Sequence, residues 1–199
     1  MQTRLEKKQE SRRRILQSAS KRLRREGLNG AGVASVMDDA GLTHGAFYSH
    51  FRNKGELARA ALEEALLHNR KRWTGKWRDG SWSKHLSRLA SRYLTTKHRD
   101  NPEDGCALAA LCSEAARSDP DFQQAYETEL LKTLRAIGGD IEADIEGQKR
   151  DDVLAFFSLV VGAIALSRAV SSEQLSNDIL ESAKEAAGKL VSGEIKNEH

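Results

Sequence analysis

Apolar residues recur at intervals of three and four along almost the whole chain, and this spacing constrains the fold more than any other feature. Only 2 prolines interrupt the 199 residues, and the alternating segments typical of strands are missing. With 39% hydrophobic residues, the chain has enough apolar side chains for a core. We therefore predict an all-α fold of about nine helices, with a three-helix N-terminal head and a six-helix C-terminal body.

The charge is divided unevenly between these two parts. Residues 1–55 carry 12 lysines and arginines against 5 acidic residues, a net charge of +7, whereas residues 56–199 carry 20 against 24, a net charge of −4. A basic module joined to a mildly acidic body is typical of a nucleic-acid-binding protein with a second function. A solvated, arginine-rich helix would give the same charge, so this observation alone leaves both interpretations open.

Cysteine content and hydropathy indicate the compartment. The chain has 2 cysteines, too few for a disulfide framework. The longest apolar run that we identify, residues 154–166, is shorter than the roughly 18 residues of a membrane span. The basic N-terminus is not followed by the apolar segment of a signal peptide. We expect a cytoplasmic protein with no membrane partner.

The head contains the pattern of a helix-turn-helix. Helices are predicted over residues 11–26, 33–40 and 43–50, after a frayed segment 1–11, and Gly41 separates the last two. Two short helices joined by a glycine-containing turn are the sequence form of this motif, whose second helix enters the major groove of DNA.

The second helix of the motif has an apolar side and a polar side. Phe47 and Phe51, four residues apart, are predicted to face inward. The small profile of His44, Gly45 and Ala46 at the helix start lets the backbone approach base edges.

Phosphate contacts are expected at the end of this segment. Tyr48 and His50 can donate hydrogen bonds to phosphates. Asn53 and Glu56 have capping-box spacing for a further helix that starts at Lys54. Because a lysine in the first helical turn opposes the helix dipole, its position makes sense if an anion binds there. A solvated lysine is the alternative.

The stretch from Arg14 to Leu57 resembles the DNA-binding domain of the TetR family of bacterial transcriptional regulators. The matching residues are Ile15, Leu16, Ala19, Leu23, Gly27, Val33, Val36, Ala40, Gly41, Leu42, Thr43, Gly45, Tyr48, His50, Phe51, Lys54 and Leu57. The resemblance implies a DNA-binding domain over residues 1–55 and an effector-binding and dimerisation domain over residues 56–199. The double-stranded operator would be contacted by Thr43, His44, Gly45, Ala46, Tyr48, Ser49, His50 and Lys54. The sequence departs from the family before the second helix, where Ala31-Gly32 replaces the usual serine or threonine cap.

Two predicted helices at the end of the chain indicate self-association. The helix over residues 151–170 is apolar nearly all round, so it must be covered on more than one side. The next, over residues 173–191, carries small residues that allow close packing, among them Ala183. A homodimer through these last two helices, which the resemblance also implies, would cover both. A fully internal helix is the alternative.

The middle helices are the expected site of a small-molecule effector. We predict that a neutral, hydrophobic molecule binds near Tyr93, Cys106, Leu111, Phe122, Tyr126 and Phe156. A solid core without a ligand is the alternative interpretation of these residues. A regulator triggered by oxidation or electrophile modification of Cys106, which lies near a predicted helix start, is a second alternative.

The expected function is sequence-specific regulation of transcription by a ligand-responsive repressor that a small effector releases from a palindromic operator. We find no serine-hydrolase elbow, phosphate-binding glycine loop or metal-ligand spacing, so we expect no enzyme activity, no cofactor and no metal. A non-specific DNA-architectural protein would lack so large an apolar body. A helical enzyme acting through Cys106 would need a paired base, which the sequence does not show.

Overall fold

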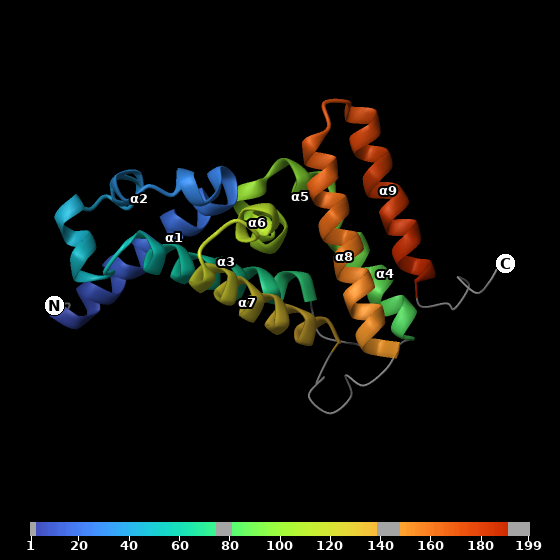
Figure 1. Cartoon of the computed structure of the whole chain (residues 1–199), viewed down its shortest axis with the longest axis horizontal. Coiled ribbons are helices and arrows are strands. Elements are labelled where there is room, and N and C mark those ends of the chain that lie inside the picture. Colours follow the sequence, from blue (N-terminus) through green and yellow to red (C-terminus); the bar gives the residue numbers. More distant parts are fainter. Residues whose placement is uncertain (1–2, 75–80, 139–147, 191–199) are drawn as a thin grey trace. The chain divides into compact units, whose positions relative to one another are not determined.

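The computed structural model describes residues 3–74, 81–138 and 148–190, and these residues form nine α-helices and two 3-10 helices without a strand. Figure 1 shows the helices in order along the chain. The predicted all-α fold is confirmed. The chain divides into two compact units, of which unit 1 comprises residues 1–69 and 102–129 and unit 2 comprises residues 70–101 and 130–199.

Unit 1 is built around a long first helix. Its elements are α1 (Arg4–Gly30), α2 (Val33–Asp39), η1 (His44–Ser49), the first part of α3 (Lys54–Thr74), η2 (Pro102–Asp104), α6 (Ala107–Ala115) and the first part of α7 (Pro120–Gly138). Because α1 buries Ile15, Ala19 and Leu23, its apolar stripe packs on α2 as well as on α6 and η2. Residues of the predicted body therefore share one core with the predicted head.

Unit 2 contains the remaining helices. They are the end of α3, α4 (Trp82–Tyr93), α5 (Thr96–Asp100), the end of α7, α8 (Gln148–Ala169) and α9 (Glu173–Lys189). Helix α9 packs against α8 and α4, as Figure 1 also shows. Arg168 of α8 donates hydrogen bonds to the carbonyl oxygens of His98 and Arg99 at 2.6 and 3.0 Å, which fixes α5 to α8.

Helix α8 is the one described helix that is long and apolar enough to cross a membrane, over Lys149–Ala169. The apolar run over residues 154–166, which is too short to cross a membrane by itself, is only part of this helix. Its packing against α4, α5 and α9 accounts for much of its apolar character, because a core helix meets the same test.

Three expectations about the helices are corrected. The first helix starts at Arg4 rather than near residue 11, because Thr3 and Glu6 form a reciprocal capping box. The helix predicted over residues 43–50 is the 3-10 helix η1, of 6 residues. The five-residue helix α5 was not predicted. The sequence predicts a kink or a break at Gly138-Gly139, and this prediction lies at the limit of the described residues, since residue 139 is outside them.

Candidate DNA-binding surface

The turn of the helix-turn-helix requires glycine. Gly41 has φ of 62°, the left-handed region that glycine adopts without penalty. Its amide donates to the Asp38 carbonyl at 2.8 Å, and the next amide, of Leu42, donates to the Met37 carbonyl at 2.9 Å. An added Cβ at Gly41 would also lie 2.6 Å from Nη2 of Arg14. The sequence therefore stops α2 at this point and redirects the chain into η1.

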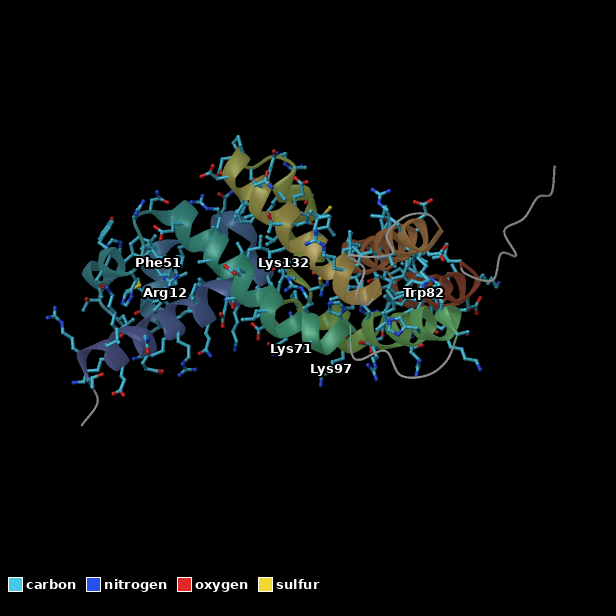
Figure 2. The ribbon with its side chains drawn as sticks, turned by 90° about the horizontal axis from the view of Figure 1, so that it is seen from below. Arg12, Phe51, Lys71, Trp82, Lys97 and Lys132 are labelled. Atoms are coloured by element: carbon cyan, nitrogen blue, oxygen red, sulfur yellow. The ribbon has the colours of Figure 1, made fainter. Side chains whose placement is uncertain are left out.

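Aromatic packing holds η1 in place. Phe47 and Phe51 are both buried, as predicted, and their rings stack with centroids 5.8 Å apart. The guanidinium of Arg12 lies over the Phe51 ring, 4.5 Å from its centroid, and Figure 2 shows the two side by side. Arg12 also donates a hydrogen bond to the His50 carbonyl at 3.4 Å. These contacts tie the end of η1 to α1.

The opposite side of η1 faces solvent. Tyr48 is 67% exposed, and its ring makes an edge contact with His44. Gly45 is exposed, and a Cβ added there would meet nothing within 4 Å. Ala46 is half-buried. The start of η1 thus offers a small, open profile, as its sequence predicts.

The hydroxyl groups of the segment differ in availability. Thr43 occupies the N-cap position of η1, but its side chain makes no capping hydrogen bond. The exposed Ser49 donates its hydroxyl to the Ala46 carbonyl at 2.7 Å. Thr43 therefore has a hydroxyl available for a phosphate, whereas the hydroxyl proton of Ser49 is already used within η1.

The start of α3 is capped much as predicted. Oδ1 of Asn53 accepts from the Glu56 amide at 2.9 Å, and the Glu56 carboxylate accepts from the Arg52 amide at 2.8 Å. The pairing differs from a standard capping box by one residue, because Arg52 rather than Asn53 is the backbone donor. Lys54 is exposed at the first helical turn. A cation beside free helix N–H groups is favourable for binding an anion.

His50, at the end of η1, is half-buried. Burial lowers its pKa, and the nearby positive charges of Lys8 and Arg12 lower it further. Its Nδ1 atom is buried without a hydrogen-bond partner in the part of the chain that the structure describes. The imidazole is therefore neutral near pH 7 and would donate to a phosphate as a neutral ring.

The basic residues at the start of α1 were not predicted as part of this surface. Lys8 and Arg12 lie close enough to lower the pKa of His50 and are exposed on a helix expected to be frayed there. The Thr3–Glu6 capping spacing was the available signal, because it predicts a helix starting at residue 4. An ordered α1 adds these charges to the surface formed by η1 and the start of α3.

The predicted effector residues are divided between the two units. Tyr93 and Phe156 are buried in unit 2, whereas Cys106, Leu111 and Phe122 are buried in unit 1, together with the half-buried Tyr126. Each is thus enclosed within its own unit, and their shared pocket stays a prediction.

Two of these residues have contacts that bear on their expected roles. The Tyr126 hydroxyl donates to the Leu108 carbonyl at 2.7 Å, and burial raises the pKa of Tyr126. This hydroxyl therefore connects α7 to α6. Cys106 is only 2% exposed, while Cys112 is exposed. A reagent would need α6 to move before it reached Cys106, and the redox alternative stays a prediction.

Comparison with known proteins shows that sequence similarity to other chains is strongest in the N-terminal head. Residues 15–61 match the family described as bacterial regulatory proteins, tetR family. The HTH-type transcriptional regulator TtgR of Pseudomonas putida is 38% identical over 58 residues. That alignment spans 29% of this chain and 28% of TtgR, so the chain matches less than a third of the length of this relative.

Solved structures extend the likeness to the fold of the whole chain. A TetR transcriptional regulator from Chloroflexus aurantiacus has a TM-score of 0.74 at 21% identity, covering 94% of this chain and 96% of that one. The regulator FadR from Bacillus subtilis, solved in complex with stearoyl-CoA, has a TM-score of 0.66 at 16% identity, covering 91% and 98%. At these identities the comparison shows a shared fold alone.

Proposed function

We propose that the chain, whose residues 15–61 match the tetR family of bacterial regulatory proteins, is a sequence-specific, DNA-binding transcriptional regulator of the bacterial cytoplasm. The observation that carries this proposal is the open face of η1. Tyr48 and the small residues at the start of η1 face solvent, while Phe47 and Phe51 hold the helix from behind. Lys8, Arg12 and Lys54 supply positive charge around this face.

The contacts divide into two classes. His44, Gly45 and Ala46 read base edges at the helix start. The phosphate backbone is contacted by Thr43, Tyr48, Ser49, His50 and Lys54. Because the hydroxyl proton of Ser49 is used within η1, Ser49 makes its contact through a water that donates to its hydroxyl oxygen, or through its backbone. Phosphate contacts set register and affinity, whereas base contacts set sequence preference.

The protein is proposed to form a homodimer through α8 and α9 and to bind DNA in this form. These helices line a mostly apolar groove within unit 2, formed by Ser158, Leu159, Gly162, Ala163, Leu166, Leu175, Asp178, Ile179, Ser182, Ala183 and Ala186. Leu166 and Leu175 are 59% and 49% exposed. Exposed leucines beside small residues favour helix packing against a second copy. Two heads related by a two-fold axis would then read half-sites about 34–36 Å apart.

The experiment that tests DNA binding is selection from a randomised duplex pool by the full chain. The proposal expects enrichment of an inverted repeat, and His44→Ala should change the enriched sequence. Tyr48→Phe should weaken binding to every duplex by a similar factor. Failure to enrich any sequence, with equal retention of random duplexes, would favour the architectural alternative.

A small effector is proposed to relieve repression from the body of the protein. The FadR structure supports this proposal, since that relative in fold is complexed with stearoyl-CoA. Buried aromatic residues such as Phe122 and Phe156 favour a neutral, hydrophobic molecule. An effector that lowers operator affinity must bind the DNA-free arrangement more tightly than the DNA-bound one.

The test is a thermal-shift screen of apolar compounds, followed by transcription in vitro from the selected operator. We expect a compound that raises the unfolding midpoint and restores transcription. Phe122→Leu should weaken that compound, while the exposed control Leu131→Ala should not. Transcription that rises when the protein is added without a compound would identify an activator instead.

A further inference from the structure

Unit 1 contains a polar cleft that neither the DNA-binding nor the predicted effector residues line. Its volume is about 540 Å³. The walls come from α1, the end of α2, α3 and η2. The lining residues are Arg14, Gln17, Ser18, Ser20, Lys21, Arg22, Arg24, Arg25, Asp39, Ala40, Glu64, Ala65, Asn69 and Asp104. Five basic side chains thus face three acidic ones.

Arg24 is the unusual member of this lining. The residue is 9% exposed, and its Nε atom is buried with no hydrogen-bond partner among the described residues. Burial lowers its pKa, an effect that the charges of Asp104 and Glu103 oppose from a distance. Within the described ranges, no carboxylate lies within ion-pair distance of its guanidinium. A buried, always protonated guanidinium without a bonded anion is costly to the folded state.

The other cations of the cleft fall into two groups. Arg22 is held by Asp39 at 2.5 Å and by Glu26 at 3.0 Å, and Arg25 is held by Glu26 and, at 3.2 Å, by Glu103. Arg14 and Lys21, by contrast, form no ion pair with the residues that the structure describes. Three cations of one cleft, Arg14, Lys21 and Arg24, therefore lack a bonded acid among the described residues.

We propose that this cleft binds a small molecule bearing a phosphate group. A guanidinium donates in a fork that matches two phosphate oxygens, and Arg14 and Lys21 supply the second positive charge that a dianion needs. The volume lies within the range of small-molecule sites. A DNA backbone is disfavoured as the occupant because Arg24 is buried within the cleft, where a duplex does not reach. This site is separate from the proposed operator and effector sites and does not depend on them.

The probe is inorganic phosphate. The thermal unfolding midpoint of the full chain is measured in increasing phosphate and, for comparison, in chloride at equal ionic strength. The wild-type midpoint should rise with phosphate and saturate. Arg24→Gln should weaken the apparent phosphate affinity at least tenfold. In chloride its midpoint should equal or exceed that of the wild type, because the unpaired buried charge is gone. The exposed Arg117→Gln, which changes the net charge equally, should respond as the wild type does.

A rise that does not saturate, or one that is equal in wild type and Arg24→Gln, would overturn the proposal, because general salt effects act on all variants alike. If Arg24→Gln does not fold, the exposed Lys21→Gln must show the weaker response, and an unchanged affinity refutes the site. A last measurement uses a random-sequence duplex. Its salt dependence should be unchanged by Arg24→Gln, and a slope reduced by about 0.9 would assign the cleft to DNA instead.

Discussion

Replacing Gly27 with alanine should destabilise unit 1 because two structural requirements meet at this residue. Gly27 interrupts α1 with φ of 74° and ψ of −170°, a region that is essentially restricted to glycine. The bend lets the Leu28 amide donate to the Glu114 carboxylate of α6 at 2.7 Å. An added Cβ would lie 2.1 Å from Oε1 of Glu114. The alanine would therefore be strained and would displace its neighbour.

The magnitude follows from these two terms. Backbone strain at such a residue costs about 1–3 kcal/mol. A hydrogen bond to a charged group contributes about 1.5–3 kcal/mol. Gly27→Ala should thus lower the free energy of unfolding by about 2.5–6 kcal/mol, or the unfolding midpoint by about 5–24 °C in a chain of this size. Glu114→Ala removes only the hydrogen bond, and water can reach the half-exposed Leu28 amide, so its cost should be about 1–2 kcal/mol.

The assay is a double-mutant cycle by urea unfolding, followed by circular dichroism at 222 nm. Because the hydrogen bond can be lost only once, the double variant should be more stable than the sum of the single effects predicts, by about 1–2 kcal/mol. The exposed control Glu127→Ala in place of Glu114→Ala should give additive effects with Gly27→Ala. Additivity in the Gly27–Glu114 cycle would refute the contact, and an unchanged Gly27→Ala would refute the strain.

Three further predictions concern binding, assembly and pH. Lys54→Ala should reduce the salt-dependence slope of DNA binding by about 0.9 per lost phosphate contact without changing the selected sequence, and an altered sequence preference would contradict its role. Leu166→Glu should give monomers in a sedimentation experiment, whereas the control Leu5→Glu, at another exposed leucine, should leave the dimer intact. Leu166 is a better test of the interface than Ala183, because Ala183 is buried in its own chain. Burial lowers the pKa of His85, whose ring hydrogen-bonds the Ile137 carbonyl, so the unfolded state binds more protons. Stability should therefore fall below about pH 6.5, by at most about 1.4 kcal/mol per pH unit, and His85→Gln should flatten that fall in urea titrations.

The sequence predicted those parts of the fold that depend on local signals. Periodicity located the apolar stripes of the long helices, and Asn53 and Glu56 located the start of α3. The start of α1 was missed although Thr3 and Glu6 carry the same kind of signal. The 3-10 form of η1 was missed for a different reason. Periodicity locates its buried residues, Phe47 and Phe51, but does not distinguish a short 3-10 helix from an α-helix.

The candidate DNA-binding residues could be proposed from the sequence because the motif is local: the turn at Gly41 and the residues that follow it lie within about ten positions. Arg24 shows why the polar cleft of unit 1 could not be predicted from the sequence. Arg24 lies between Leu23 and Arg25, on a helix whose sequence predicts a basic, solvated surface. Its burial depends on η2, which lies far along the chain at Pro102–Asp104 and packs on α1. No periodicity of α1 encodes that contact, so a buried arginine and a surface arginine have the same local sequence. Only the packing of distant segments distinguishes them.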